Sequence, residues 1–293
     1  MMFLSEIRSL TISEAVFKTV AFFDVFDFCL TPEELADRLL GYDASLTEIR
    51  EYLLNPVGVA VQDGYVFLAG RDDLVSMRKN GEAHHDLLLR KVHRFQWLFR
   101  WVPFLEGVYL CNRLTMAQAR AGSDIDIFVV ARPGRLFIVR TFMTALFHLL
   151  GLRRHGTRVA GRFCLSFFVD QSGVSLEGHL RQPCDPYFAY WTLLLQPLYG
   201  GVDILAQNGW LRDYFSERVL RKLDSDIPEK KDTRGYLGDL LESWLSRWQL
   251  ARAHRTLRSL GNPSGVILTR HCLKFHDRDM RQEYVENWKS KIS

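Results

Sequence analysis

Residues 121–130 read Ala-Gly-Ser-Asp-Ile-Asp-Ile-Phe-Val-Val and place two aspartates, Asp124 and Asp126, at the start of an apolar, β-branched run. In a β-strand the side chains at i and i+2 point to the same face. Asp124 and Asp126 are therefore expected to project side by side, with Ile125 and Ile127 on the opposite face. Two carboxylates this close repel each other unless a proton or a cation joins them, and Mg²⁺ prefers such oxygen ligands. The pair is a candidate metal site for phosphoryl or nucleotidyl transfer. On these residues alone, a simple turn leading into a strand stays the alternative.

Composition and length are those of an ordinary globular protein. The chain has 293 residues, of which 47% are hydrophobic and 25% are charged, and this length suggests two or three compact units. The formal net charge is +4 and the pI is near 8.8, which suits a polyanionic ligand without indicating nucleic acid by itself. No signal peptide or long apolar run is evident, so we expect a cytoplasmic protein with no membrane association. The five cysteines are widely spaced, and we expect reduced thiols.

The first 80 residues predict three helices followed by a β-hairpin. Apolar residues at helical spacing cover 12–28. A second helix is predicted from Thr31 as N-cap, Pro32 in the first turn and Glu34 completing a capping box. A third helix is predicted over 46–54, where Asn-Pro ends it.

The hairpin is predicted over 57–68, with Gln62-Asp63-Gly64 at its turn. Three helices and a hairpin in this order resemble a winged helix-turn-helix domain. A DNA-reading helix needs side chains that neutralise phosphate, but the third helix carries Arg50 between Glu48 and Glu51. We therefore expect a structural or protein-docking role for this unit, with DNA binding as the alternative.

The rest of the chain predicts a mixed region followed by helices. The mixed region has predicted helices over 81–101, 115–120 and 136–150, and predicted strands over 108–111, 124–130 and 163–169. Beyond Asp170 we predict helices over 186–198, 203–208, 211–223, 236–260 and 266–288. Residues 231–293 carry twelve Lys and Arg against seven Asp and Glu. This excess favours solvated helix faces over a nucleic-acid surface.

The order strand, short helix, Asp-x-Asp strand, helix, strand resembles the nucleotidyltransferase fold of the DNA polymerase β superfamily. Asp124-Ile125-Asp126 closely matches the Asp-hydrophobic-Asp motif of that family, and the resemblance covers residues 84–175. With its N-terminal unit, the chain resembles a bacterial subgroup of nucleotidyltransferase-domain proteins that begin with a winged helix. Further resemblances to that subgroup are Pro103-Phe104, Arg132-Pro133-Gly134-Arg135, Cys164-Leu165-Ser166 and Asn208-Gly209-Trp210.

The resemblance implies an α+β fold with a nucleotidyltransferase-like mixed sheet flanked by helices. It implies a winged-helix-like domain over 1–80, a nucleotidyltransferase-like domain over 81–180 and a helical C-terminal region over 181–293. The implied reaction is Mg²⁺-dependent transfer of a nucleoside monophosphate from an NTP, with ATP as the first candidate, to an acceptor hydroxyl. Asp124 and Asp126 would hold the metal. The acceptor would be a small molecule or a protein.

Two other features of the family pattern are less regular here. The slot that holds Gly-Ser in the family holds Cys111-Asn112, where Asn112 could donate a hydrogen bond to phosphate and the Cβ of Cys111 could crowd it. The family also has a third carboxylate on a later strand. Asp170 is the candidate because strand alternation would point its side chain to the same face as Cys164. The alternative is a turn residue at the end of the strand.

The remaining candidate nucleotide contacts are Ser123 beside the pair and the phosphate clamps Arg113, Arg132 and Arg135. A guanidinium group binds phosphate oxygens bidentately, but each arginine could equally be a surface charge. The altered Cys111-Asn112 slot leaves a second hypothesis open. In that hypothesis the chain is a catalytically weakened, nucleotidyltransferase-like binding or regulatory protein. Such a protein could associate with DNA through its N-terminal unit.

Overall fold

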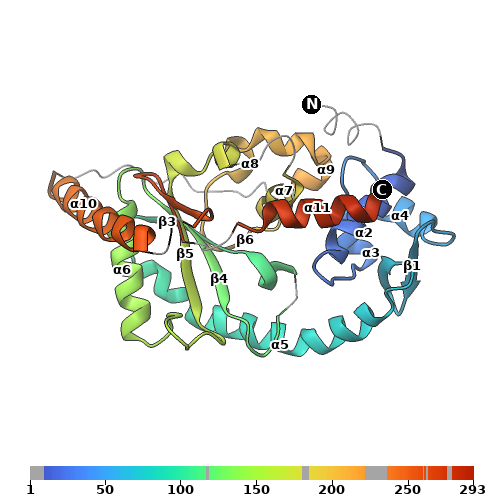
Figure 1. The fold of residues 1–293 in the computed structure, drawn as a ribbon, viewed down its shortest axis with the longest axis horizontal. Helices are drawn as coiled ribbons and strands as arrows, with labels where there is room; N and C mark the ends of the chain where they lie inside the picture. The colour runs from blue at the N-terminus through green and yellow to red at the C-terminus, as the bar shows by residue number, and fades with distance from the viewer. Residues whose placement is uncertain are drawn as a thin grey trace.

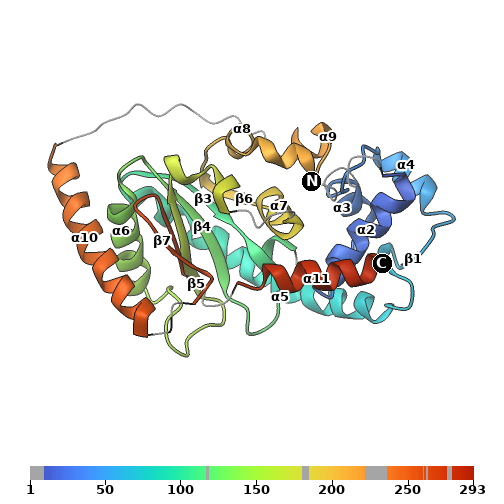
Figure 2. The same cartoon turned by 45° about the horizontal axis from the view of Figure 1, so that its top comes forward.

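The computed structural model describes residues 10–116, 119–179, 185–221, 236–259, 261, 263–275 and 279–293. They form a mixed α+β structure in which a six-stranded sheet is flanked by helices (Figures 1 and 2). The small N-terminal unit lies at one end, and helix α5 (Asp73–Phe95) runs from it along the large sheet. No helix of the described residues is long and apolar enough to cross a membrane.

The N-terminal unit has the predicted order of three helices and a hairpin. Its elements are α2 (Ile12–Asp24), α3 (Pro32–Ala36), α4 (Leu46–Tyr52), β1 (Val59–Gln62) and β2 (Tyr65–Leu68). Each helix begins with a capping box, and the box predicted for Thr31 and Glu34 is confirmed, with Pro32 in the first turn. The hairpin turns through Asp63 and Gly64, which both have positive φ, as a two-residue hairpin turn requires.

The helix predicted over 81–101 begins earlier and ends in a tighter form. Helix α5 begins at Asp73 because Leu74 and Val75 are buried against the N-terminal unit. Its continuation, η1 (Gln96–Trp101), is a 3₁₀ helix that buries Leu98 and Phe99.

The large sheet has the strand order β6-β3-β4-β5-β8-β7. Its strands are β3 (Leu105–Leu110), β4 (Ile125–Ala131), β5 (Phe163–Asp170), β6 (Gln196–Gly200), β7 (Val266–Leu268) and β8 (Cys272–Phe275). Only the central pair, β4 and β5, is parallel. The crossover between them contains α6 (Leu136–Leu149), which packs against both strands. The predicted central strands are confirmed. The short helix predicted over 115–120 differs: the 3₁₀ helix η2 covers Asn112–Met116, residues 119–120 are not helical, and 117–118 lie outside the described residues.

Each face of the sheet is covered by a different set of helices. Helix α6 covers one face, and α10 (Tyr236–Ser259) packs on its outer side (Figure 1). Glu242 of α10 accepts hydrogen bonds from the backbone N–H groups of Phe137 and Ile138, so it caps the start of α6 from a neighbouring helix. On the opposite face α7 (Pro186–Leu193) packs against Phe128 and Phe167.

The prediction that the C-terminal third is helical is wrong in two places. Residues 266–275 form the hairpin β7–β8 instead of the first half of a helix, and α11 begins only at Arg281 (Arg281–Ile292). Residues 196–200 form edge strand β6, so α7 ends at Leu193. Among the described residues, β6 is followed by three short helices: α8 (Ile204–Gln207), η5 (Gly209–Asp213) and α9 (Glu217–Leu220). Residues 266–275 form a hairpin and not a helix because pairing with β5 satisfies the backbone hydrogen-bonding groups of β8 and buries Cys272 and Leu273.

The C-terminal segments complete cores that begin elsewhere in the chain. Trp288 of α11 is fully buried among N-terminal residues, including Phe22, and Tyr190 of α7 stacks on the same phenylalanine at 4.3 Å. The described residues after 185 are thus divided between the sheet and the N-terminal core. Four of the five cysteines are described as free thiols, and Cys184 lies outside the described residues.

Candidate functional site

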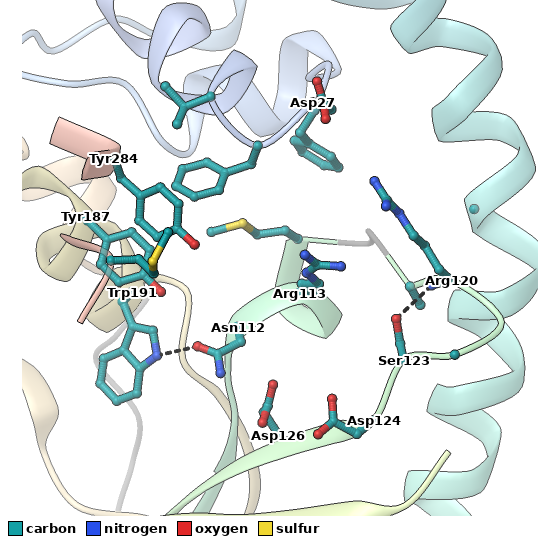
Figure 3. A pocket seen from close by; sticks show the side chains of 18 of the residues that line it. Asp27, Asn112, Arg113, Arg120, Ser123, Asp124, Asp126, Tyr187, Trp191 and Tyr284 are labelled. Carbon is teal, nitrogen blue, oxygen red and sulfur yellow. Dashed lines mark hydrogen bonds between the residues drawn. The ribbon is translucent and has the colours of Figure 1, made fainter. Parts of the chain in front are cut away.

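Asp124 and Asp126 lie side by side where β4 begins, as predicted. Ile125 and Ile127 are buried on the other face of the sheet, so strand alternation directs both aspartates to one side. Figure 3 shows the two carboxylates together at the edge of a cavity. Ligand atoms of Asp124, Asp126 and Cys164 all lie within 4.8 Å of one another.

The turn before β4 is fixed by hydrogen bonds. The Ser123 hydroxyl accepts from the backbone N–H of Arg120 at 2.9 Å (Figure 3). Two further backbone bonds, Gly161 N–H to the Ser123 carbonyl and Ile125 N–H to the Arg162 carbonyl, tie the strand to the loop before β5. The aspartates therefore stand on a backbone that is anchored on both sides.

The two carboxylates have different electrostatic surroundings. Burial, and then repulsion from Asp124, raise the pKa of Asp126 above its ordinary value, while a hydrogen bond from Asn112 partly opposes the rise. Asp124 instead forms an ion pair with Arg154, with Nη1 and Oδ2 2.6 Å apart. Arg154 comes from the loop before β5, and its positive charge also slightly offsets the rise in the pKa of Asp126.

Asn112 is held in place at the start of η2. Its φ of 60° is in the left-handed region, which asparagine tolerates better than most residues. The Trp191 indole N–H donates to the Asn112 side-chain oxygen at 2.9 Å. Because an indole can only donate, this bond turns the amide nitrogen of Asn112 away from Trp191 and toward Asp126. Cys111, expected to crowd a phosphate, is instead buried in the apolar layer against α7 and does not line the cavity.

The cavity beside the aspartates has a volume of about 1110 Å³. Its walls come from α5, η2, α7, α11 and the loop after α2. Opposite the aspartates, Tyr187 stacks on Tyr284 with ring centroids 5.1 Å apart, and Phe26 packs against both (Figure 3). The cavity thus has an acidic edge and an aromatic wall.

The structure brings five of the predicted site residues together and leaves three elsewhere. The five that line the cavity are Asn112, Arg113, Ser123, Asp124 and Asp126. Arg132 pairs with Glu106 at 2.8 Å, and Arg135 is buried and pairs with Asp239 at 2.6 Å. Both follow the far end of β4, whose last residue, Ala131, lies roughly 17 Å from Asp126 at ~3.3 Å per strand residue. These two arginines therefore lie outside the cavity.

Asp170 also lies at the far end of the sheet. In the parallel pairing of β4 with β5 it stands opposite Ala131, whereas Asp126 stands opposite Cys164. The buried Asp170 carboxylate accepts from the backbone N–H groups of Gly134 and Gly173, and it contacts His271 Nδ1 at 2.8 Å. These contacts fit the turn interpretation, and Asp170 is not placed as the third carboxylate.

Cys164 occupies the position beside Asp126 that Asp170 was expected to fill. Burial, and then the charge of Asp126, raise the pKa of the Cys164 thiol to about 12, so it is a neutral thiol at ordinary pH. A neutral thiol is a poor ligand for Mg²⁺. Because the sequence does not fix the register between β4 and β5, no sequence signal identified Cys164.

Lys274 of β8 is a second site residue that the sequence analysis missed. It lines the cavity, and its amine lies 5.7 Å from the centre of the Phe167 ring. It forms no hydrogen bond or ion pair with another described residue. Burial, and then the nearby Arg281, lower the pKa of Lys274. Because residues 266–288 were predicted to be helical, nothing in the sequence placed Lys274 on the sheet.

Metal binding to this pair is expected to depend on pH. Since the pKa of Asp126 is raised, this carboxyl keeps its proton at pH values where an ordinary aspartate is ionised, and the metal has to displace that proton. We therefore expect Mn²⁺ affinity to increase as pH rises through the pKa of Asp126. Electron paramagnetic resonance titrations of Mn²⁺ from about pH 4 to pH 7 would measure it. An affinity that is flat over this range would contradict the expectation.

Comparisons with known proteins add no relative: the chain matches no protein-family model, no curated protein and no solved structure.

Proposed function

We propose that the protein is a Mg²⁺-dependent nucleotidyltransferase that moves a nucleoside monophosphate from an NTP to an acceptor hydroxyl. The observation that carries the proposal is the pair Asp124 and Asp126, side by side at the edge of a cavity of about 1110 Å³. In the reaction the bond between the α-phosphorus and the bridging oxygen breaks, and a bond from the acceptor oxygen forms. Pyrophosphate leaves, and the acceptor proton passes to solvent.

The donor set at the pair fits one Mg²⁺ ion. Asp124 and Asp126 offer carboxylate oxygens. The pKa of Asp126 is raised first by burial and then by repulsion from Asp124, and a bound cation would relieve that repulsion. Bound Mg²⁺ would stabilise negative charge on phosphoryl oxygens. The Arg154 guanidinium pairs with Asp124, and we expect it to turn toward a phosphate when a metal binds the pair.

Three cavity residues are suited to hold the phosphates. Asn112 is oriented by Trp191, so that its amide donors face the aspartate side. Arg113 is exposed at the cavity and could bind phosphate oxygens as a fork. The Lys274 amine, which forms no hydrogen bond or ion pair with a described residue, would gain an anionic partner. The aromatic wall of Tyr187 and Tyr284 would pack against a planar group of the nucleotide or of the acceptor.

A nucleotide-binding protein without turnover is the second candidate, and Cys164 is the observation that favours it. A two-metal mechanism needs enough oxygen ligands for both ions, and the neighbour of Asp126 offers a neutral thiol. Calorimetry with Mg²⁺ and ATP, GTP, CTP or UTP, followed by assays of pyrophosphate release with candidate acceptors, separates the two candidates. Release of pyrophosphate supports the transferase, and binding without release supports the second candidate. Absence of nucleotide binding contradicts both.

Cys164→Asp is expected to strengthen metal binding at the pair. The new carboxylate would stand opposite Asp126 in the β4–β5 register and would add a hard oxygen ligand. We expect Mn²⁺ affinity to rise at least about tenfold, because ligand charge tunes the affinity of carboxylate sites over several decades. Electron paramagnetic resonance titration measures the change, with Cys164→Ser as the matched control of unchanged charge. An affinity equal to that of Cys164→Ser would show that position 164 does not face the metal.

A further inference from the structure

The outer side of helix α10 carries an unusual row of side chains. Trp244, Trp248 and Arg252 are spaced four residues apart, so they lie along one side of the helix. Both indoles are exposed, at 63% and 49%, and their rings are parallel within 4° with centroids 6.4 Å apart. The Arg252 guanidinium lies 5.8 Å from the centre of the Trp248 ring. On the inner side of the same helix, Leu245 and Gln249 are buried against α6.

A cluster of three arginines adjoins this row. Arg140 of α6 donates to the Gln249 side chain, and its guanidinium lies 4.7 Å from the centre of the Phe275 ring. Burial, and then the positive charges of Arg153 and Arg252, lower the pKa of Arg140 to about 10. Arg153 and Arg252 therefore each repel Arg140, which lies at the seam between α6 and α10.

No carboxylate of the described residues compensates the charge of this cluster. None of Arg140, Arg153 and Arg252 forms an ion pair with a carboxylate among the described residues, and Arg140 Nε is buried without a hydrogen-bond partner. In addition, residues 243–259 of α10 contain four arginines and no acidic residue. Guanidinium groups that lie close together without a carboxylate cost free energy. The arrangement therefore points to an anionic ligand that comes from outside the chain.

We propose that the row on α10 and the arginine cluster beside it bind single-stranded nucleic acid. Exposed aromatic rings that stack bases and a positive track that follows the phosphates are the two parts of such sites. Here Trp244 and Trp248 would stack bases, and Arg252 with the cluster would hold the phosphates. An anionic membrane suits the row less well. A membrane-surface helix separates its apolar and cationic faces, whereas Trp248 and Arg252 lie on the same line. This proposal does not depend on the proposed function at Asp124 and Asp126.

Fluorescence anisotropy with the full-length protein tests the proposal. The probe is a fluorescein-labelled oligo(dT) or oligo(U) of about 12 nucleotides, a length within the range of known single-strand sites. We expect Trp248→Ala to weaken binding about tenfold, the effect of removing one stacking ring. We expect Arg252→Glu to weaken it about tenfold or more and to flatten the salt dependence. Both side chains are exposed, so both variants should fold.

Matched controls lie at the opposite edge of the sheet. Trp97 is 51% exposed on η1, which packs beside β6, whereas α10 packs beside β7. Trp97→Ala and Arg100→Glu should leave oligonucleotide binding unchanged, and so should Asp126→Asn. The proposal is overturned if the oligonucleotides do not bind or if the α10 variants bind as tightly as the controls. It is also overturned if a duplex binds better than the single strand, or if only phosphatidylserine-containing vesicles bind in a sedimentation assay.

Discussion

Asp126→Asn is expected to abolish Mg²⁺-dependent nucleotide binding and any nucleotidyl transfer. The substitution keeps the shape of the side chain and removes the charge that a divalent ion requires. Metal stabilisation of phosphoryl charge is worth several kcal/mol. At ~1.4 kcal/mol for each factor of ten, a loss on the order of a thousandfold in transfer rate follows. Pyrophosphate release and calorimetric titration of Mg²⁺·ATP would measure the two losses. Asp124→Asn should behave in the same way.

The matched control is Asp27→Asn in the same cavity. Asp27 lies on the wall away from the pair (Figure 3) and binds Arg71 at 2.8 Å. Asparagine tolerates its positive φ, so the backbone should not change. Metal and nucleotide affinity should stay at the wild-type level. If both Asp124→Asn and Asp126→Asn also keep full affinity, the pair is not the metal site and the proposed function fails. That outcome leaves the nucleic-acid surface on α10 untouched.

Trp288→Ala is expected to have the largest effect on stability, about 3–5 kcal/mol. The indole is fully buried, meets the edge of Phe22 and donates its N–H to the Lys18 carbonyl at 2.9 Å. The substitution removes this packing and leaves a cavity between α11 and α2. Urea denaturation followed by circular dichroism would measure the loss. A large loss would show that the end of the chain completes the N-terminal core.

The exposed Trp101 gives the control for this measurement. It is 67% exposed on η1, so Trp101→Ala should change the free energy of unfolding by less than about 0.5 kcal/mol, as is usual for surface substitutions. A similarly small change for Trp288→Ala would mean that α11 does not pack against α2 in solution. The cavity wall that α11 provides would then be in doubt as well.

Local sequence signals predicted the elements that are formed by near neighbours in the chain. The capping box of Thr31 and Glu34 and the turn at Asp63 and Gly64 involve residues within a few positions of each other. The aspartate strand was predicted from its own alternation. These signals do not depend on what the element packs against, which explains why the structure agrees with them.

The C-terminal strands could not be predicted in the same way. Residues 266–275 contain apolar residues that suit a helix or a strand, and their state is decided by pairing of Cys272 with Val169 more than 100 residues earlier. The same limit applies to β6, which exists because it pairs with β3. Short strands of this kind are determined by partners distant in the sequence, and intrinsic preference is overridden by that context.

The site was predicted only as far as strand alternation allows. Alternation of side chains along the strand predicted that Asp124 and Asp126 lie on one face, but it does not predict the register between two paired strands. Asp170 was expected to join the pair because it shares parity with Cys164. In the structure Asp126 is paired with Cys164 and Phe128 is paired with Phe167, so β5 has one extra residue between these two pairs. As a result, Cys164 and Asp170 no longer point to the same face of the sheet, although they are an even number of residues apart. Asp170 then lies beyond reach, and Cys164 takes the place beside Asp126.

A crystal structure of the protein with Mn²⁺ and a non-hydrolysable ATP analogue would show whether Asp124 and Asp126 bind the metal. We expect an anomalous manganese peak within about 2.5 Å of carboxylate oxygens of both Asp124 and Asp126, a bond length typical of hard cations on carboxylates. The analogue's phosphates should lie between that peak and the side chains of Asn112 and Lys274. A manganese peak at other residues, or the analogue bound outside this cavity, would contradict the account.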